Sequence, residues 1–395
     1  MRAVALLVSV LTLGAGALMY RNSRSAPGAP GPALHAAPSP RIASPAGDWP
    51  TYHGGFTLDG LAAGKVPDVP ERVWRYTAGN RVEVTPVSAQ GKIFFTSAKG
   101  GLHALDFAGH ELWKRDFGKD NTFSSPALAT DGLVVAGTHN GVLLALDAAT
   151  GRDRWKYDLG GTVQGTPNRV ELPGGKPGVV AISQGDGCIH GIDLETGKGV
   201  WKTDAVERCD GSAGVGSGRL VMGSCASALH VFSLEKAAKI SDIPLGGDCQ
   251  VAGGVALSGT MAYAGSRGGK FFAVDTEGVR IVWTNSDCQR EAFTTPAVTP
   301  ERVIFGADDG KVYGLNREKG TKAWEFDTGS NPKSPVAAGD RVAVTSGGVL
   351  FLLDPATGKK IWSESVGDEI TSPSIVGGMI LVGSDDGTVS AYGKK

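Results

Sequence analysis

Five cysteines are the residues of this chain with the most distinctive chemistry: Cys188, Cys209, Cys225, Cys249 and Cys288. No two are adjacent and none forms a C-x-x-C pair, so their spacing does not suggest zinc or haem. Cys209 and Cys225 flank the stretch GVGSGRL (214–220), and a hairpin centred near residue 217 would set them opposite each other, within reach of a disulfide. The triplet DCQ, at 248–250 and 287–289, makes Cys249 and Cys288 a looser second pair and leaves Cys188 unpaired.

Two roles stay open for these thiols. Disulfides persist in exported proteins, and the role that we favour is to staple loops in a weak part of the fold. The other role is a ligand-facing or redox-active patch. Within the repeat described below, all five cysteines fall at the same end of the strands, so we expect them to gather on one face of the molecule.

Histidines and acidic pairs offer metal-ligand chemistry at other places. His103, His190 and His230 occupy the same slot of successive repeats, which suggests a metal ring, but other repeats place Leu144 or Phe272 there. Packing between repeats is therefore the favoured role of this slot. The stretches GADDGKV (306–312) and GSDDGTV (383–389) look like calcium loops, but the same residues favour tight hairpins, and calcium needs six or more oxygen ligands. We assign no metal site and no catalytic residue.

Composition narrows the class of protein. The 395 residues carry 39 Lys and Arg against 40 Asp and Glu, a formal net charge of −1, so there is no basic footprint for nucleic acid. The 59 glycines are spaced among runs of Val, Leu, Ile and Phe. This pattern predicts many short strands joined by tight turns.

The first 48 residues differ from the rest. Residues 3–20 form an uncharged apolar run after Arg2, which predicts that residues 1–20 are a signal peptide or an N-terminal membrane anchor of an exported protein. No cysteine lies near this run, so a lipoprotein anchor is not expected. Residues 21–48 are rich in Pro, Ala and Ser and predict an extended linker. The folded domain is expected to span 49–395.

Tryptophans mark a repeat. Trp74, Trp113, Trp155, Trp201, Trp283, Trp324 and Trp362 are spaced by 39, 42, 46, 82, 41 and 38 residues. The spacing of 82 corresponds to two repeats with one tryptophan replaced, and Ile240 stands at the expected place. A period near 40 residues therefore runs through the whole domain.

Each repeat has the same order of residue types and predicted strands. A small residue before Pro is followed by two strands, a Gly-rich turn, a third strand ending near Asp, and a fourth strand with the tryptophan. In ALDAATGRDRW (145–155) the Asp147 carboxylate can accept backbone N–H groups of the turn, Gly151 supplies a positive φ, and Trp155 lies between neighbouring repeats.

Counting the repeats gives the architecture. Eight openings occur, near residues 84, 124, 165, 211, 252, 294, 333 and 371, and the last repeat ends after its third strand. The segment RVWRYTAG (72–79) lies ahead of the first opening and can supply the missing strand. The sequence therefore predicts an all-β, eight-bladed β-propeller of four-stranded antiparallel blades, closed by an N-terminal strand at 72–79.

The turn of the repeat carries a resemblance. The pattern A/G-x-D-x-x-x-G-x-x-x-W, in ALDAATGRDRW, GIDLETGKGVW (191–201) and, loosened, GLNREKGTKAW (314–324), resembles the pyrroloquinoline-quinone (PQQ) repeat family, and DWPTYHGG (48–55) resembles the lead-in of that family. One branch comprises quinoprotein dehydrogenases that hold PQQ and calcium over the channel. Another is the BamB-like, non-catalytic scaffold of outer-membrane protein assembly. The chain lacks the adjacent cysteine pair of the first branch and the lipid-anchoring cysteine of the second.

These observations favour a non-catalytic binding scaffold of the cell envelope. We expect a monomeric propeller, periplasmic or anchored facing the periplasm, that takes up segments of other envelope proteins and needs no cofactor. Membrane association would go through residues 3–20. The alternative that the resemblance implies is a PQQ-dependent oxidoreductase with PQQ and calcium, since fold alone does not decide function.

The partner site is expected at the channel mouth. The start of every first strand should face the channel on the side of the cysteines. The residues just before each opening form the mouth set: Arg81, Glu83, Asn121, Gln164, Arg208, Asp210, Gln250, Glu291 and Asp368. The set is mixed in charge, which suits a polar or peptide partner. The simpler interpretation is a solvated rim, which any propeller has.

Overall fold

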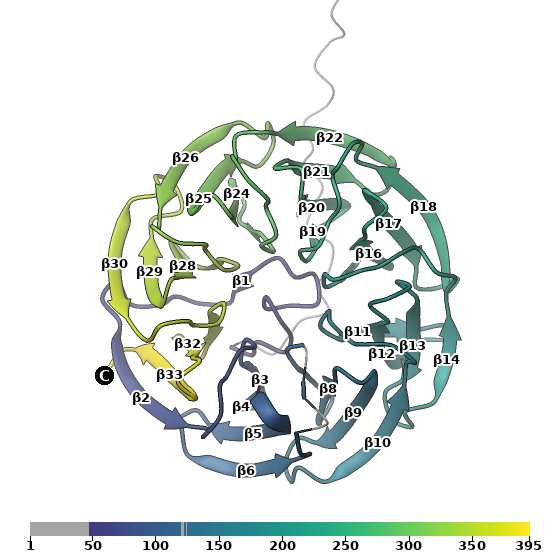
Figure 1. Cartoon of the computed structure of the whole chain (residues 1–395), viewed down its shortest axis with the longest axis vertical. Coiled ribbons are helices and arrows are strands. Elements are labelled where there is room, and N and C mark those ends of the chain that lie inside the picture. Colours follow the sequence, from purple (N-terminus) through teal and green to yellow (C-terminus); the bar gives the residue numbers. More distant parts are fainter. Residues whose placement is uncertain (1–46, 120–121, 124) are drawn as a thin grey trace, which may run out of the picture. The chain divides into compact units, whose positions relative to one another are not determined.

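Each repeat folds into an antiparallel sheet, and eight such sheets stand as blades around a central channel (Figure 1). The computed structural model describes residues 47–119, 122–123 and 125–395. The expected leader (1–20) and all but the end of the expected linker lie outside the described residues. Within the part of the chain that is described, no helix is long and apolar enough to cross a membrane.

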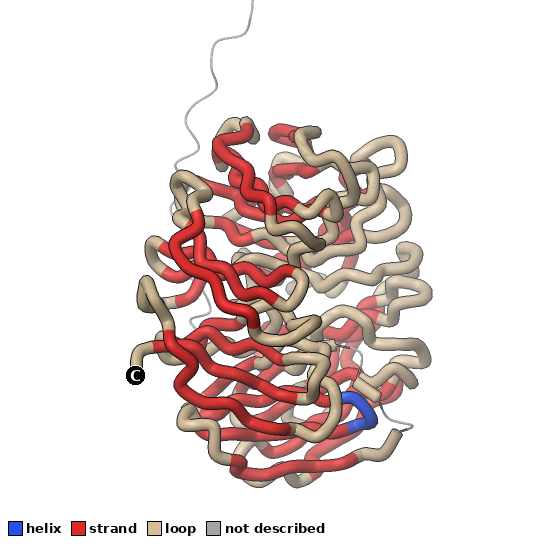
Figure 2. The backbone as a smooth tube through the Cα atoms, turned by 60° about the vertical axis from the view of Figure 1, so that its left-hand side comes forward, coloured by secondary structure: helices blue, strands red, loops and turns tan. Residues whose placement is uncertain are grey.

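The regular structure is almost entirely strand (Figure 2). Blade 1 consists of β3 (Val87–Ala89), β4 (Lys92–Ser97), β5 (Gly101–Asp106) and β6 (Glu111–Asp116), and blade 2 of β7 (Leu128–Thr130), β8 (Leu133–Gly137), β9 (Val142–Asp147) and β10 (Asp153–Asp158). Blade 3 consists of β11 (Asn168–Leu172), β12 (Lys176–Ile182), β13 (Ile189–Asp193) and β14 (Gly199–Lys202). Blade 4 consists of β15 (Gly214–Gly216), β16 (Arg219–Gly223), β17 (Ala228–Ser233) and β18 (Ala238–Pro244). A short 3₁₀ turn, η1 (Ala98–Gly100), joins β4 to β5.

Blades 5 to 8 complete the ring. Blade 5 consists of β19 (Ala256–Ser258), β20 (Met261–Gly265), β21 (Phe271–Asp275) and β22 (Arg280–Asn285), and blade 6 of β23 (Ala297–Val298), β24 (Arg302–Ala307), β25 (Lys311–Asn316) and β26 (Lys322–Asp327). Blade 7 consists of β27 (Val336–Ala338), β28 (Arg341–Ser346), β29 (Val349–Leu353) and β30 (Lys360–Ser365). Blade 8 consists of β31 (Ser374–Val376), β32 (Met379–Gly383), β33 (Thr388–Gly393) and β2 (Glu71–Thr77).

The ring is closed by the N-terminal strand. β2 pairs antiparallel with β33, so that Trp74 lies opposite Ala391. The closure predicted for residues 72–79 is confirmed, with the strand itself running from Glu71 to Thr77. Because the pairing joins the two ends of the domain, β33 is not left as an unpaired edge strand.

Tryptophan side chains join neighbouring blades. Five indoles donate their N–H to a backbone carbonyl in the next blade: Trp74 to Phe107 (2.9 Å), Trp113 to Ala148 (3.1 Å), Trp155 to Leu194 (2.8 Å), Trp283 to Arg317 (3.0 Å) and Trp324 to Pro355 (3.0 Å). At the same joints a Cβ built on the turn glycine, Gly109, Gly151, Gly197, Gly320 or Gly358, would lie 2.5 to 2.7 Å from the ring. We call a joint with both features a complete joint.

The replaced tryptophan corresponds to Ser241 and not to Ile240. In every outer strand a bulge precedes the tryptophan, as between Asp153 and Trp155, and the extra residue has no cross-strand partner. In blade 4, Val231 pairs with Ser241 and Phe232 with Lys239, so Ile240 is the extra residue and is 49% exposed. The spacing of the sequence could not reveal the bulge, which is why the expectation was one residue off.

Hydroxyl groups of the repeat openings hold the blades together near the channel. The backbone N–H of Thr166 donates to Ser212 Oγ (3.0 Å), that of Thr295 to Ser334 Oγ (3.0 Å) and that of Ser334 to Ser372 Oγ (3.2 Å). Each bond runs from one blade to the next. The small hydroxyl residue of the opening is therefore an inter-blade hydrogen-bond acceptor.

The segment from Gly47 to Ala62, which we call the lead-in, runs inside the channel (purple in Figure 1). Its carbonyls accept the backbone N–H groups of the innermost strands of blades 1, 2, 4, 5, 6 and 7, through the pairs Ser88–Trp49, Ala129–Pro50, Val215–Phe56, Leu257–Thr57, Val298–Asp59 and Ala337–Gly60. Asn168 Nδ2 of blade 3 donates to Phe56 O (2.7 Å), and Gly377 N of blade 8 donates to Gly47 O (3.4 Å). The lead-in ends in β1 (Leu61–Ala62), parallel to β27.

The lead-in fills one end of the channel. The partner residues lie beside the hairpins that join first and second strands, which is the end opposite the cysteine-bearing loops. Trp49, Thr51, His53 and Leu58 are at most 1% exposed. The channel is therefore occupied at this end, and its mouth is at the other.

Candidate functional site at the channel mouth

Two kinds of loop build the mouth face. One joins the outer strand of a blade to the inner strand of the next, and the other joins second to third strands. Cys209, Cys249 and Cys288 lie in loops of the first kind, and Cys188 and Cys225 in loops of the second. Because consecutive antiparallel strands alternate in direction, both kinds of loop end on the same face, where the sequence placed the five thiols.

A repeated backbone bond fixes the mouth residues. Carbonyls of Arg81, Arg208 and Glu291 accept the N–H of Ala98 (2.7 Å), Cys225 (2.9 Å) and Asp308 (2.8 Å), each from the loop between second and third strands of the same blade. The carbonyls that accept this bond in the remaining blades that have it belong to Thr122, Thr162, Gln250 and Glu369. These residues are structurally equivalent, so the equivalents of Arg81 in blades 2, 3 and 8 lie one or two residues from the predicted Asn121, Gln164 and Asp368.

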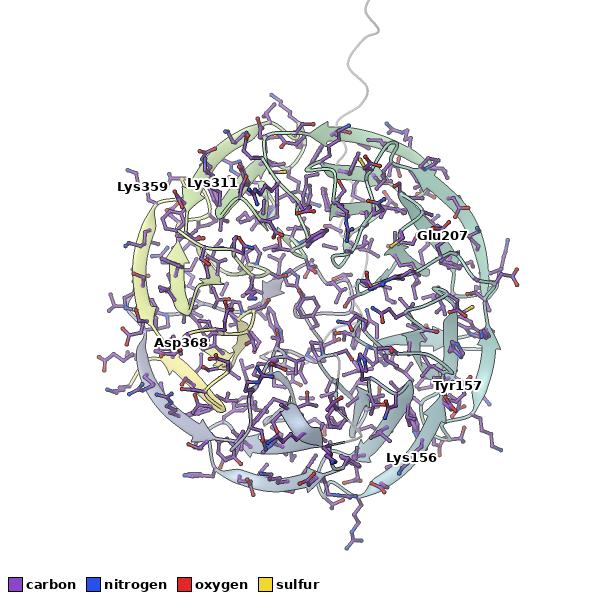
Figure 3. The ribbon with its side chains drawn as sticks, in the orientation of Figure 1. Lys156, Tyr157, Glu207, Lys311, Lys359 and Asp368 are labelled. Atoms are coloured by element: carbon purple, nitrogen blue, oxygen red, sulfur yellow. The ribbon has the colours of Figure 1, made fainter. Side chains whose placement is uncertain are left out.

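The members of the mouth set differ in exposure. Arg81, Glu83, Gln164, Arg208 and Asp368 are exposed, and Asp210, Gln250 and Glu291 are half-buried. Asn121 lies outside the described residues. Figure 3 shows Asp368 inside the ring of outer strands, whereas Lys156 lies beside the outer strand β10. Arg208 and Asp210 form an ion pair (2.9 Å) at the edge of blade 4.

A cavity of about 440 Å³ opens at the mouth between blades 1, 2, 7 and 8. It brings together two members of the mouth set, Arg81 and Glu83, and leaves out the others. Its remaining charged lining is Lys333, Glu369 and Asp385, and the ring of Tyr52 from the lead-in contributes to it. Sequence reasoning missed these four, although Lys333 stands in a repeat opening and Asp385 in an acidic turn.

Ion pairs organise the rim of this cavity. Arg81 pairs with Glu83 (3.3 Å) and Lys333 with Glu369 (3.5 Å). The Glu369 N–H donates to Asp385 Oδ1 (3.3 Å), and the Tyr52 hydroxyl hydrogen-bonds Ser334 Oγ (2.6 Å). Since both ion pairs are solvent-exposed, they contribute little to stability and can rearrange around a ligand.

Acidic side chains continue the rim into blade 6. The pKa of Asp308 is raised above its ordinary value by burial and by the nearby carboxylates of Glu291 and Asp309, with Lys333 acting in the opposite direction. A raised pKa caused by like charges means that ionisation of this cluster is opposed. Around Asp308, the carboxylates of Glu291 and Asp309 face two cations, Lys333 and Arg290.

The acidic turns act as hairpin caps. Asp309 accepts the N–H of Gln289 (2.8 Å) and the Tyr313 hydroxyl (2.7 Å), and Asp386 accepts the N–H of Thr388 (3.0 Å). Across the described residues, no group of three or more His, Cys, Asp or Glu side chains is arranged to hold a metal ion. The local geometry agrees with the turn interpretation of these stretches.

The histidines of the third strand are packing residues. His103, His190 and His230 are 0%, 4% and 3% exposed. Burial lowers the pKa of His103 to about 4. The structure therefore confirms the packing interpretation of this slot.

Blade 4 contains an order of groups that resembles a catalytic triad. Ser224 Oγ lies 2.7 Å from His230 Nε2, and His230 Nδ1 lies 2.7 Å from Asp242 Oδ1. However, Ser224 is 0% exposed, and its hydroxyl oxygen also accepts the N–H of Ala226 (3.0 Å). A hydroxyl that no substrate can reach is not a nucleophile, so these bonds are structural.

The cysteines are free thiols in the structure. Strands β15 and β16 pair Gly214 with Val221, and beyond them Cys225 N–H donates to Arg208 O, so Cys225 lies opposite Arg208 and Cys209 points to the other side. Cys209 is 1% exposed, whereas Cys225 is exposed. The backbone pairing is thus offset by one residue from the directly opposed placement expected for Cys209 and Cys225, and their disulfide stays a prediction.

Cys249 and Cys288 contact adjacent residues of blade 5. A Cβ built on Gly268 would lie 3.4 Å from Cys249 Sγ, and the Cys288 thiol donates to Gly269 O (2.9 Å). The double-glycine turn thus lies against both thiols. Their pairing stays a prediction.

The cavity does not suit PQQ, a planar tricarboxylate. Three carboxylates, Glu83, Glu369 and Asp385, line it, and its two cations are already paired with carboxylates. Like charges would oppose binding of a trianion. The residues present therefore do not fit the cofactor, and no redox step is derived for this chain.

The blade joints and the ring closure define an eight-bladed propeller of the PQQ-repeat class. The family model described as "Outer membrane protein assembly factor BamB" matches residues 68–212, 185–368 and 329–395. Together these segments extend from the closing strand to the C-terminus. The chain belongs to this family.

Individual relatives agree with this assignment. The chain is 26% identical over 326 residues to the outer membrane protein assembly factor BamB of Shewanella oneidensis, covering 73% of this chain and 80% of the relative. It is also 26% identical over 302 residues to BamB of Burkholderia pseudomallei (71% and 76%). A quinohemoprotein alcohol dehydrogenase of Comamonas testosteroni is 28% identical over 182 residues, only 39% of this chain and 25% of that enzyme.

Solved structures share the fold. BamB from Moraxella catarrhalis superposes with a TM-score of 0.68 at 22% identity, covering 82% of this chain and 98% of that one. The quinohemoprotein alcohol dehydrogenase from Comamonas testosteroni gives a TM-score of 0.73 at 15% identity, covering 88% and 81%. At such identities the likeness concerns the fold alone.

Proposed function

We propose that this protein is a non-catalytic scaffold of the bacterial cell envelope that acts in outer membrane protein assembly by holding other envelope proteins. The observation that carries the proposal is the extent of the family match, which covers all eight blades. The relatives that align along most of their length are named as outer membrane protein assembly factors. No catalytic step is assigned to any residue.

The mouth face is the proposed binding surface. Its loops carry exposed donors and acceptors of both signs, held in place by the repeated backbone bonds that include the carbonyls of Arg208 and Glu291. A rigid surface of this kind suits a polar segment of another protein, because the free and bound forms then need little rearrangement. The other end of the channel is occupied by the lead-in, which hydrogen-bonds the inner strands there.

The location of the protein belongs to the same proposal. Residues 3–20 would direct export, either as a cleaved signal or as an anchor, and place the propeller on the periplasmic side. Residues 21–48 would then act as its tether. Mass measurement of the mature protein and cell fractionation decide between cleavage and anchoring.

Capture of partners by crosslinking tests the proposal. A photo-crosslinking residue introduced beside the mouth should capture envelope proteins, and replacing Arg208 and Glu291 with Ala should reduce that capture without unfolding the exposed loops. The matched control replaces Lys156 and Lys359, two exposed lysines away from the mouth, with Ala. Capture that the mouth variants leave unchanged would move the site to the outer edges of the blades.

The oxidoreductase alternative has its own test, motivated by the partial match to the quinohemoprotein alcohol dehydrogenase. Purified protein is mixed with PQQ and calcium and assayed for a bound chromophore and for dye reduction with alcohols. We expect neither. Stoichiometric uptake with turnover would overturn the scaffold proposal.

A further inference from the structure

The lead-in lies behind the mouth cavity. It occupies the channel beyond the cavity, and the Tyr52 side chain of the lead-in forms part of the lining. A ligand can therefore enter from the mouth face. At about 440 Å³ the cavity lies in the size range of small-ligand sites, enough for a short stretch of peptide.

Its walls are apolar below a charged rim. Val82, Val84, Pro126 and Ile370 contribute apolar surface, and Tyr52 adds an aromatic ring. A wall of this kind suits the hydrocarbon stem of a long side chain whose charged end stays near water. Lysine and arginine side chains have this construction.

The charge of the rim selects the sign of the ligand. Glu83, Glu369 and Asp385 outnumber Arg81 and Lys333, and both of these cations are already paired. Among the described residues no lysine or arginine forms an ion pair with Asp385. In blade 6, the carboxylates of Glu291, Asp308 and Asp309 outnumber the nearby cations Lys333 and Arg290 and add to the negative field at the mouth.

We propose that this cavity receives a lysine or arginine side chain from an extended segment of a partner protein, with Asp385 and Glu369 as its carboxylate partners. The inference rests on the proposed scaffold function and names the chemistry of the partner. The incoming cation would pair with Asp385 directly and compete with Lys333 for Glu369. An acidic segment would instead meet three carboxylates.

Two synthetic peptides test the proposal: acetyl-Gly-Arg-Gly-Arg-Gly-amide and its glutamate counterpart, acetyl-Gly-Glu-Gly-Glu-Gly-amide. Binding to the full propeller is measured by calorimetry at low salt and again at 0.15 M salt. We expect the arginine peptide to bind more tightly than the glutamate peptide and to weaken with salt, because the contacts are exposed charges. Equal or tighter binding of the glutamate peptide would overturn the proposal.

Charge-neutralising variants locate the contact. Asp385→Asn and Glu369→Gln should each weaken binding of the arginine peptide about fivefold, as expected for loss of one partly exposed charge pair. Glu195→Gln, an exposed acid in a turn on the opposite face, is the matched control and should change nothing. Binding that Asp385→Asn and Glu369→Gln leave intact would place the peptide elsewhere and contradict the proposal. Equal melting temperatures of all variants exclude unfolding as a cause.

The crosslinking experiment distinguishes a failure of the cavity proposal from a failure of the proposed scaffold function. If the crosslinking experiment still captures envelope proteins while the peptide results go against the cavity, only the cavity proposal fails. If the propeller captures no envelope protein at all, the scaffold function itself fails. A peptide that binds as expected then describes the chemistry of the pocket alone.

Discussion

The five complete joints and the two joints that flank blade 4 pack neighbouring blades together with different residues. At a complete joint the tryptophan ring packs on a glycine of the next blade, and the indole N–H donates a hydrogen bond to a backbone carbonyl of that blade. At the joint between blades 3 and 4, the Trp201 indole N–H has no partner among the described residues, and Ala237 stands at the glycine position. At the next joint Ser241 replaces the tryptophan and Val279 replaces the glycine.

This difference shows which property of the glycine a complete joint requires. Val279 keeps a positive φ of 51°, so the turn itself tolerates a side chain at some cost. What the glycine provides at a complete joint is room for the indole ring. Where the ring is absent, Val279 takes the position, and Ile281 packs against the core shared by blades 4 and 5.

The largest effect is expected from removing an indole at a complete joint. Trp155→Ala should lower the free energy of unfolding by about 3–5 kcal/mol, because it leaves a cavity and an unpaired Leu194 carbonyl. Ser241→Ala should change stability by less than about 0.5 kcal/mol, since the Ser241 hydroxyl has no partner among the described residues. Urea unfolding of both variants measures the contrast. Equal losses would mean that blade 4 is held as the others are.

A second contrast concerns the third-strand slot, where blade 1 has His103 and blade 5 has Phe272. The pKa of His103 is lowered to about 4 by burial, so the unfolded chain takes up the proton first as pH falls. Stability is therefore complete above pH 6.5 and should fall by about 3 kcal/mol between pH 6.5 and pH 4 on account of this residue. His103→Phe, which copies blade 5, should flatten that part of the pH profile of unfolding. A profile that keeps its slope in the variant would assign the acid sensitivity to other groups, such as His53, whose pKa is also about 4.

Adding a methyl group to the glycine at a complete joint should have a smaller effect. Gly320→Ala places a Cβ 2.5 Å from Trp283 on a backbone with φ of 69°, so stability should fall by about 2 kcal/mol. Val279→Gly, at the matching position without a tryptophan, should change stability by less than about 1 kcal/mol. Thermal unfolding compares the two. A large loss in the second variant would show that the valine is essential to its joint.

A double-mutant cycle can convert the joint between blades 4 and 5 into a complete joint. Ser241→Trp alone should destabilise by about 1–2 kcal/mol, because the ring meets Val279. Adding Val279→Gly should recover that loss, giving a coupling energy of about 1–2 kcal/mol. Chemical denaturation of the four proteins measures it. Additive effects would mean that ring and glycine do not meet at this joint.

The smallest effect is a difference in thiol reactivity. Cys225 is exposed, whereas burial raises the pKa of Cys209 and Cys288 to about 12, so a thiol reagent should label Cys225 first in the folded protein. Labelling after unfolding in denaturant counts all five thiols. Protein isolated from an oxidising compartment that lacks two or four reactive thiols after unfolding would reveal disulfides.

Periodicity made the ring predictable. A bulky residue recurring every 40 residues or so fixes the number of blades, and the missing last strand fixes the closure. Details that depend on one residue of register were not predictable, because a bulge moves Ile240 outward and an offset of one residue pairs the Cys225 backbone with Arg208 instead of Cys209.

The cavity was only half predictable for a different reason. Arg81 and Glu83 follow from the repeat, but Tyr52 reaches Ser334 across 282 residues of sequence, and no local pattern records such a contact. Lys333 of blade 7 and Asp385 of blade 8 line the same cavity as Arg81 only because the closed ring brings the last blades beside blade 1. Sites of this kind require the closed structure.

The lead-in also has a consequence for the order of events in folding. A ribosome makes residues 47–62 before any blade, yet their hydrogen-bond partners extend from Ser88 to Gly377. The lead-in can therefore reach its final position only after the last blade exists. Long sequence separations of this kind slow folding. Once the lead-in is in place, its hydrogen bonds to the blades must break before the ring can open fully. The lead-in therefore opposes unfolding that begins at either end of the domain.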